Sequence, residues 1–339
     1  MAERNSAEDN RAFTYHGGAL DVAHRLAPRA PEPWIDLSTG VNPYPYPLPK
    51  LEREVWSRLP TAEALLELEA AAAFRYGVTI ETVVAGPGSQ ALIQALSRMT
   101  PYGAVGVLGP TYGGHAEAFA AAGACVREAK GLEAMGDFDV AVVVNPNNPD
   151  GRVTTRADLL KLHGRLARRG KGLIVDEAFA DFDAAGESLA PVLPASGAVV
   201  LRSFGKSFGL PGLRLGFAIA SGDVVKTLRA VLGPWPVSGP AIAIGTKALA
   251  DLDWVEGMRV RLGEEAARLD ALLKGSGWRI LGGTRLFRLG AREDAAKAFR
   301  RLLAAGILAR PFAGAADRLR FGIPGKEANW RRLASALSR

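Results

Sequence analysis

The residues whose types and spacing most clearly suit chemistry stand in a glycine-rich segment with a lysine at its centre. In RSFGKSFGLPGLRLG, Lys206 has Ser203 three residues before it and Arg214 eight residues after it. A lysine between glycines, taken alone, is more simply a solvated loop residue. Serine and arginine suit a phosphate, however, and glycines permit a close approach of the backbone. The set therefore predicts an amine that forms a Schiff base with a phosphate-bearing cofactor.

A carboxylate at the end of an apolar run is the second candidate. Asp176 follows GLIV, so its charge would lie at the edge of the core, where an unpaired charge is costly. For a lone aspartate, a helix N-cap or a salt bridge is the simpler interpretation. If Lys206 forms a Schiff base, the expected partner of Asp176 is the protonated pyridine nitrogen of pyridoxal phosphate (PLP). A carboxylate beside that nitrogen keeps the ring able to accept electrons.

Two further segments follow strand-like runs. AGPGSQALIQAL places Gly88, Ser89 and Gln90 between a strand and the start of a helix, where free backbone N–H groups bind anions. We expect the cofactor phosphate there, although any strand-to-helix turn with a serine cap has a similar sequence. The other segment, NPNNPDG, follows VAVVV and cannot continue that strand because of its prolines.

The elements that would position these residues alternate along the chain. Strand-like runs such as AVGVLG, VAVVVNP, KGLIVDEA and GAVVLRSF are separated by helical stretches of about ten to fifteen residues. Apolar strands without polar alternation predict a mostly parallel sheet that is covered on both faces. Ligands of such sheets bind at the carboxyl ends of the strands, where the candidate residues stand. The predicted fold class is α/β.

The flanking segments have different patterns. The first fifty residues include NPYPYPLPK and predict an extended arm with turns. Helices are expected over LEREVWSRL and over AEALLELEAAAAFRYG, with Gly77 in a C-cap position. Beyond Gly239, a long helical region from about 241 to 273 precedes short strands and helices, which is the order of a smaller α+β unit.

Composition narrows the classes of function. The length of 339 residues suggests two domains, and 48% hydrophobic with 23% charged residues is typical of a globular chain. The single cysteine, Cys125, predicts a reducing, cytoplasmic location and no zinc site. We find no apolar run long enough for a signal peptide or a membrane span. The net charge of +7 is scattered, and its densest run, RLARRGK, is interpreted as a solvated helix end, so no nucleic-acid partner is expected.

Together these motifs resemble the PLP-dependent aminotransferases of the aspartate aminotransferase fold, in the branch with histidinol-phosphate aminotransferase and threonine-phosphate decarboxylase. NPNNPDG, DEAFADF and SFGKSFGLPGLRLG carry the resemblance, which extends from HGG at 16–18 to the C-terminal LRFGIPG. It implies a large domain over 51–240 with a mostly parallel seven-stranded sheet. A small α+β domain would comprise 241–339 with part of the arm, 1–50. A homodimer is implied as well, because relatives build the site at the subunit interface.

The resemblance implies a role for each cofactor-binding residue. Lys206 would be the catalytic Schiff-base lysine and would move protons. Asn148 would hydrogen-bond the phenolic oxygen of PLP, Asp176 would pair with the ring nitrogen, and Tyr112 would stack on the ring. The cofactor phosphate would be held by Ser203, Arg214 and the backbone of Gly88, Ser89 and Gln90.

A phosphorylated amino acid is the implied substrate. Arg320, in RLRFG, matches the family's arginine for the substrate carboxylate. A second anion site is needed for the substrate phosphate, and His16, Arg310 and Arg320 are its candidates, although His16 is also interpretable as a plain loop residue. Asn42, in DLSTGVNP, is a further candidate. Surface or cap positions are expected for the remaining histidines, His24, His115 and His163.

Three positions depart from the family's aminotransferases. Phe179, in DEAF, stands where these enzymes usually have a tyrosine that hydrogen-bonds the phenolic oxygen. Leu59, in RLP, stands where relatives often have a tyrosine that contacts the cofactor phosphate across the dimer. Gly205 stands where many relatives have a hydroxyl residue beside the lysine. These departures indicate a site that differs from that of an ordinary transaminase.

The DEAF variant, the early HGG and the proline-rich arm most resemble the decarboxylase of this branch. That enzyme converts O-phospho-L-threonine to 1-aminopropan-2-yl phosphate and carbon dioxide in cobalamin biosynthesis. We expect the same reaction here, but the sequence leaves open which Cα bond stands perpendicular to the cofactor ring. The alternatives are a histidinol-phosphate-type aminotransferase and, from another class, a PLP-binding regulator. Such a regulator would carry a winged helix-turn-helix, for which the arm is expected to be too short.

Overall fold

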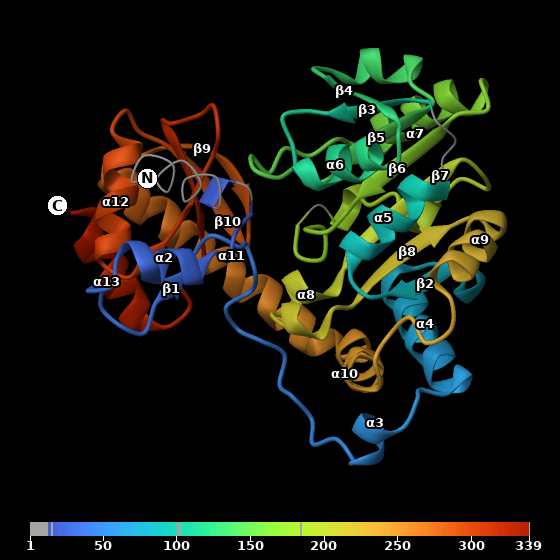
Figure 1. Ribbon diagram of the computed structural model, residues 1–339, viewed down its shortest axis with the longest axis horizontal. Helices are drawn as coiled ribbons and strands as arrows, with labels where there is room; N and C mark the ends of the chain where they lie inside the picture. Colours follow the sequence, from blue (N-terminus) through green and yellow to red (C-terminus); the bar gives the residue numbers. More distant parts are fainter. Residues whose placement is uncertain (1–12, 15, 100–102, 184, 339) are drawn as a thin grey trace. The chain divides into compact units, whose positions relative to one another are not determined.

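The computed structural model describes residues 13–14, 16–99, 103–183 and 185–338. The chain divides into two compact units (Figure 1). The larger unit comprises residues 45–148 and 152–256, and the smaller unit comprises 1–44, 149–151 and 257–339.

A seven-stranded sheet forms the centre of the larger unit. Its spatial order is β2-β8-β7-β6-β5-β3-β4, and every neighbouring pair is parallel except the two that involve β8. The predicted mostly parallel sheet of seven strands is therefore confirmed. Its strands are β2 (Val83–Gly86), β3 (Ala104–Leu108), β4 (Cys125–Ala129), β5 (Val140–Val144), β6 (Gly172–Asp176), β7 (Ala198–Ser203) and β8 (Gly216–Ala220).

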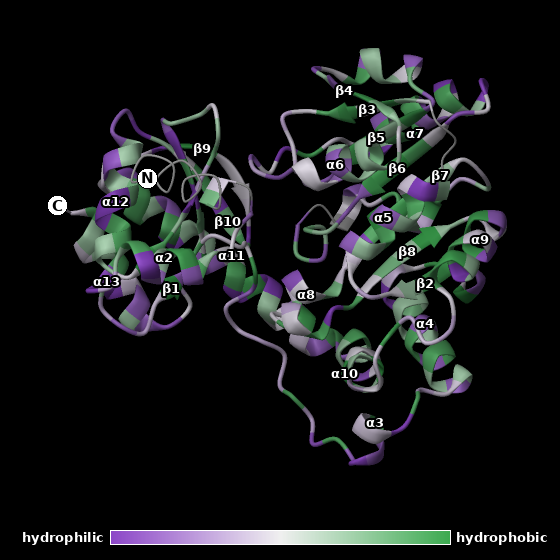
Figure 2. Cartoon of the chain, in the orientation of Figure 1, coloured by the Kyte–Doolittle hydropathy of each residue, from purple (hydrophilic) through white to green (hydrophobic). Residues whose placement is uncertain are grey.

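Helices cover this sheet because its central strands are apolar on both faces. All five residues of β5 are buried, as are all six of β7. Figure 2 shows these strands as hydrophobic and the helices around them as mixed in hydropathy. The α-helices of the unit are α3 (Glu54–Ser57), α4 (Ala62–Tyr76), α5 (Ser89–Met99), α6 (Gly113–Ala121), α7 (Arg156–Ala167), α8 (Phe204–Ser207), α9 (Gly222–Leu232) and α10 (Gly239–Ala250).

Short 3-10 turns complete the connections of the larger unit. One of them, η5, lies between the lysine-bearing α8 and strand β8 and so shapes the glycine-rich segment. The turns are η1 (Ile80–Thr82), η2 (Leu132–Asp137), η3 (Ala185–Glu187), η4 (Ala190–Val192) and η5 (Pro211–Leu213).

The smaller unit is built around an antiparallel sheet in the order β12-β13-β10-β9. A separate parallel pair joins β1 in the arm to β11 near the C-terminus, so the arm belongs to this unit. Its strands are β1 (Ile35–Asp36), β9 (Arg279–Thr284), β10 (Phe287–Ala291), β11 (Ile307–Leu308), β12 (Arg310–Pro311) and β13 (Arg318–Gly322). Its helices are α2 (Leu20–Leu26), most of α11 (Leu252–Gly275), α12 (Ala295–Ala304) and α13 (Glu327–Leu337).

Helix boundaries show where local sequence was a sufficient guide. Helix α4 ends at Gly77 as predicted, because this residue adopts the left-handed conformation, with φ of 67°, that suits glycine. The predicted helix over LEREVWSRL is wrong beyond the four residues of α3, and Trp56 lies 68% exposed there. Good helix formers do not hold a short helix without a buried face.

The long helical region predicted for 241–273 is in fact two helices. Asp251 separates α10 from α11, and its Oδ1 accepts a hydrogen bond of 3.0 Å from the backbone N–H of Trp254. A side-chain oxygen that satisfies a free N–H of the first turn starts a new helix.

Among the residues that the structure describes, none of the helices combines the length and the apolar character that a membrane span requires. In the same part of the chain, no cluster of three or more histidine, cysteine or acidic side chains is placed to hold a metal ion.

Two leucines of α7 allow a matched test of this packing. Leu162 is 1% exposed and Leu160 is 38% exposed on the same helix. Leu162→Ala should lower the free energy of unfolding by about 2–5 kcal/mol because it leaves a cavity in the core. Leu160→Ala should cost less than about 1 kcal/mol. Urea unfolding monitored by circular dichroism measures both values, and equal losses would contradict this placement of α7.

Candidate active site

The candidate cofactor residues gather where parallel strands end in the larger unit. β5, β6 and β7 are neighbours, with Val144 opposite Asp176 and Asp176 opposite Leu201 in the register. Asp176 ends β6, Ser203 ends β7, and Lys206 follows at once in α8. Because the carboxyl ends of parallel strands share one edge of a sheet, these side chains are brought together.

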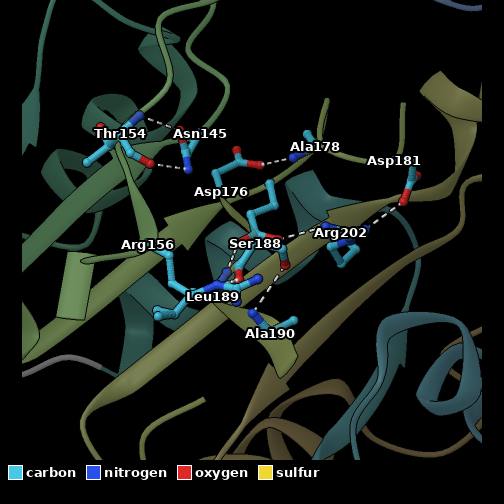
Figure 3. Close-up of polar contacts among 11 residues, drawn as sticks. Asn145, Thr154, Arg156, Asp176, Ala178, Asp181, Ser188, Leu189, Ala190 and Arg202 are labelled. Atoms are coloured by element: carbon cyan, nitrogen blue, oxygen red, sulfur yellow. Dashed lines mark hydrogen bonds and ion pairs between the residues drawn. The ribbon is translucent and has the colours of Figure 1, made fainter. Parts of the chain in front are cut away.

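The loop after β5 is closed by one side chain. Asn145 accepts a hydrogen bond of 2.8 Å from the N–H of Thr154 and donates one of 3.0 Å to its carbonyl oxygen (Figure 3). Asn147 is also held, since its Oδ1 accepts from the Thr111 hydroxyl at 2.5 Å. These bonds fix the segment that carries Asn148, which is buried.

Asp176 lies against a histidine that the sequence analysis misplaced. Its Oδ2 lies 2.8 Å from Nε2 of His115, and its Oδ1 accepts from the backbone N–H of Ala178 at 3.0 Å. An ionised carboxylate only accepts, so Nε2 carries the proton of this bond. The predicted surface or cap position of His115 is wrong, because this residue has no exposed area. The missed signal was its spacing of four from the buried Phe119, which puts both on one face of α6.

The ionisation of Asp176 follows from its surroundings. Burial alone would raise the pKa of this carboxyl, but the hydrogen bond and charge of His115 act in the opposite direction. The charge of Lys206 and the N–H of Ala178 also favour the carboxylate, so the pKa lies below its ordinary value. A buried, ionised carboxylate is thus held ready for a cationic group.

Lys206 lies over an aromatic ring. Its Nζ is 4.8 Å from the ring centroid of Phe179, which is 2% exposed and follows β6 in the DEAF motif. An ammonium over the face of a ring gains a cation–π attraction. Phe179, at the position where the resemblance led us to expect a tyrosine, therefore presents an apolar face to the amine.

An anion cradle forms between the start of α5 and the segment before β8. Gly88 has φ of 87°, and a Cβ on it would lie 2.8 Å from Nη2 of Arg214. The guanidinium of Arg214 therefore approaches the first turn of α5, which begins with Ser89 and Gln90. Helix N-terminal N–H groups and a guanidinium at one place favour an anion such as phosphate.

Tyr112 connects the cradle to the buried carboxylate. Its hydroxyl donates to Oε1 of Gln90 at 2.9 Å, and its ring centroid is 6.1 Å from that of His115. An aromatic plane, an amine, an ionised carboxylate and an anion cradle thus occur together in one unit. This donor set fits a flat, phosphate-bearing aldehyde cofactor such as PLP.

The candidate substrate residues lie in the smaller unit, where two arginines oppose each other. Arg310 of β12 pairs with Arg320 of β13 in the register. Arg320 is 1% exposed, and its Nη2 donates to the carbonyl oxygen of Ser38 at 2.5 Å. Burial and the charge of Arg310 lower the pKa of Arg320, while Asp36 raises it. Like charges opposite each other on neighbouring strands repel, which favours an anion beside them.

The N-terminal arm contacts Arg320 through the carbonyl oxygen of Ser38. The Ser38 hydroxyl accepts from the N–H of Gly18 at 2.7 Å, and His16 lies exposed two residues earlier. Asn42 is buried, and its Oδ1 accepts from the N–H of Tyr44 at 2.9 Å, so part of this amide serves a local turn. The other histidines, His24 and His163, bond to Glu32 and to the carbonyl oxygen of Ser196.

Comparison with known proteins identifies the family. Residues 32–337 match the model for aminotransferase class I and II. The chain belongs to this family. It is 45% identical to threonine-phosphate decarboxylase of Pseudomonas aeruginosa, over 95% of this chain and 96% of that protein. It is 41% identical to the enzyme of the same name from Sinorhizobium sp, over 96% and 97% of the two chains.

A solved structure confirms the predicted fold. Histidinol-phosphate aminotransferase from Sinorhizobium meliloti, in complex with pyridoxal-5'-phosphate, matches with a TM-score of 0.82 at 20% identity. The match covers 94% of this chain and 93% of that structure. The aspartate aminotransferase-like fold predicted from the motifs is therefore correct.

The low pKa of Asp176 makes the stability of the fold depend on pH. Because its folded pKa is below the unfolded value of about 3.9, the carboxylate contributes stability that is complete above about pH 5. That contribution disappears as the pH falls through the folded pKa. Asp176→Asn does not titrate, so the free energy of unfolding of the wild type minus that of the variant should decrease from pH 7 to pH 3. Urea unfolding of both proteins at each pH measures this difference in the free energy of unfolding. A difference that grows on acidification would refute the lowered pKa of Asp176.

Proposed function

We propose that this chain is a PLP-dependent threonine-phosphate decarboxylase, which converts O-phospho-L-threonine to (R)-1-aminopropan-2-yl phosphate and carbon dioxide. The observation that carries the proposal is its 45% identity, over nearly the full length of both chains, to an enzyme of that name. The class I and II family and the PLP-containing structural neighbour support the cofactor. The lysine, carboxylate and anion cradle of the larger unit are the residues that such chemistry needs.

Each cofactor contact is assigned to a residue of the larger unit. The amine of Lys206 would form the covalent link, the carboxylate of Asp176 would pair with the ring nitrogen, and the amide of Asn148 would hydrogen-bond the phenolic oxygen. Tyr112 would cover the ring, and Ser203, Arg214 and the backbone of Gly88, Ser89 and Gln90 would hold the phosphate. When bound, PLP accepts the electron pair that is released at Cα. His115 keeps Asp176 ionised for this purpose.

Lys206 is the proton donor that we assign to the reaction. The bond between Cα and the carboxylate breaks, carbon dioxide leaves, and Nζ of Lys206 delivers the proton that replaces it at Cα. Phe179 offers no hydroxyl near this amine, so the ring face of the phenylalanine excludes water from that side of Nζ.

The smaller unit supplies the cations for a substrate with two anionic groups. Arg310 and Arg320 are the arginines for carboxylate and phosphate, and His16 and Asn42 are further contacts. A carboxylate held too tightly before the reaction would be slower to leave, so Arg320 orients this group and does not stabilise its ground state strongly. The net charge of +7 is consistent with a protein that binds a phosphorylated cofactor and a phosphorylated substrate.

Decarboxylation and transamination give different products, which makes the proposal testable. Purified protein with PLP and O-phosphothreonine should release carbon dioxide and the phosphorylated amine in equal amounts, measured by ¹⁴C release and mass spectrometry. Lys206→Ala should abolish turnover and the visible absorbance of lysine-bound cofactor. Formation of a 2-oxo acid without carbon dioxide would establish a histidinol-phosphate-type aminotransferase instead. Retained lysine-bound absorbance in the variant would refute the role of Lys206.

A cytoplasmic homodimer that serves cobalamin biosynthesis is part of the same proposal. The larger unit carries several exposed large apolar side chains near its first two helices, including Trp56, Leu59, Leu66 and Phe74. Trp235, 56% exposed, borders a cavity of about 310 Å³ beside the start of α4. Contiguous exposed apolar patches mark interaction sites. We propose that these side chains form such a patch and that a second copy of the chain covers it.

Charge placed on this patch should therefore separate the subunits. The wild type should show twice the chain mass by light scattering after size exclusion, and Leu66→Glu combined with Phe74→Glu should show the monomer mass. Val153→Glu is the control, because Val153 is an exposed apolar residue of the same unit outside this patch. A monomeric wild type, or a double variant that remains dimeric, would contradict the assignment.

A further inference from the structure

An ionic cluster is buried behind the strand ends of the larger unit. Nη1 of Arg202 donates to Oε2 of Glu177 at 2.6 Å. Figure 3 shows the second bond of this guanidinium, in which Nη2 donates to Oδ1 of Asp181 at 2.7 Å. The exposed fractions of these side chains are 8%, 0% and 3%. Tyr76 packs its ring 4.3 Å from the guanidinium carbon. Two carboxylates thus share one cation in the interior.

Such a cluster is not explained by stability alone. Removing three charges from water costs more than their attraction regains in most proteins, and apolar replacements are often as stable. Burial opposes the charge of Arg202, but Asp181 and Glu177 outweigh it and raise its pKa. Burial and the charge of Asp181 likewise raise the pKa of Tyr76. Arg202 therefore stays charged, and the contribution of the cluster lies in the positions at which it holds the chain.

The cluster lies on the opposite side of β6 from Asp176. Successive residues of a strand point to opposite faces, so Asp176 faces His115 of α6 while Glu177 faces Arg202. Leu201, the register partner of Asp176, belongs to the core on the α6 side. Arg202, next along β7, consequently points to the face of Glu177. One face of these strand ends carries the candidate chemistry, and the other carries the ionic cluster.

Arg202 bridges the two ends of a short turn that touches the catalytic groups. Glu177 and Asp181 bracket the turn, and the N–H of Ala180 donates to the carbonyl oxygen of Glu177 at 3.1 Å. Inside the turn, Ala178 donates its N–H to Asp176, and Phe179 lies under Nζ of Lys206. The position of the turn is thus transmitted to both the carboxylate and the amine.

We propose that Arg202 and Asp181 are positioning residues for the reaction: their ion pair closes the 177–181 turn and so sets the orientation of Asp176 and of the Lys206 amine. The inference rests on the proposed function in that bound PLP reports this orientation. Glu177 stabilises more of the structure than this turn, since it also accepts hydrogen bonds from the Ser188 hydroxyl and the N–H of Leu189.

The number of charges left in the cluster decides which substitution can test the ion pair without unfolding the chain. Arg202→Met would leave two buried carboxylates without a cation and is expected to unfold the chain. Asp181→Ala leaves Arg202 paired with Glu177, one charge against one, and removes only the second end of the bridge. Asp181→Asn restores an oxygen that accepts from Nη2 of Arg202. Glu69→Gln is the control, because it weakens the ion pair of another buried carboxylate of the same unit, whose partner Arg229 is 43% exposed.

The four holoproteins are compared by steady-state kinetics with O-phosphothreonine, by visible circular dichroism of the bound cofactor and by urea unfolding. Asp181→Ala should lower kcat about 10- to 100-fold, the range for a small displacement of reacting groups, with KM changed less than about threefold. Its cofactor circular dichroism should change as well. Asp181→Asn should recover kcat to within about threefold of the wild type. Glu69→Gln should lose stability and keep kcat and the cofactor signal.

Each other outcome has a defined meaning. An active wild type with Asp181→Ala unchanged in kcat and in the cofactor signal would overturn this inference and leave the proposed function standing. Equal losses of activity in Asp181→Ala and Glu69→Gln, in proportion to their losses of stability, would show a purely structural role and also overturn it. A wild type that binds no PLP at Lys206 would overturn the proposed function and this inference together.

Discussion

Parallel pairing of β5, β6 and β7 is the constraint on which the rest of the larger unit depends. Parallel strands need helical crossovers, and these crossovers cover both faces, so each of these three strands is apolar up to its last one or two residues. Polar residues are tolerated only beyond the last apolar position. Asn148, Asp176 and Ser203 therefore meet at one edge of the sheet, although many residues separate them in the chain.

Charge at this edge is balanced separately on the two sides of β6. Asp176 is held by His115 on one side, and Glu177 is held by Arg202 on the other. Adjacent carboxylates in a strand would repel if both faced one way, but the alternation of a strand directs them to different partners. The DEAF motif thus combines the carboxylate that we propose for the cofactor with one that holds the turn beside Lys206.

Sequence reasoning succeeded where the signal is local or where it repeats. The runs of apolar residues located the strands of the seven-stranded sheet, and the glycine after α4 located its end. It failed over 51–59, where the helix-forming residues include no buried side chain in α3, and at Asp251, whose side chain begins a new helix. His115 was missed because a histidine carries no local mark of burial, and only the partner across the interior makes its burial stable.

By itself, the sequence determined the class of sheet, the order of the motifs and the family, because apolar runs and residue types are properties of short segments. The tertiary structure alone decided which charged groups share a partner. Arg202 could have paired with any nearby carboxylate, but the register of β6 and β7 and the turn that follows bring Glu177 and Asp181 to it. Ion pairs between distant segments depend on register and burial, which no single segment encodes.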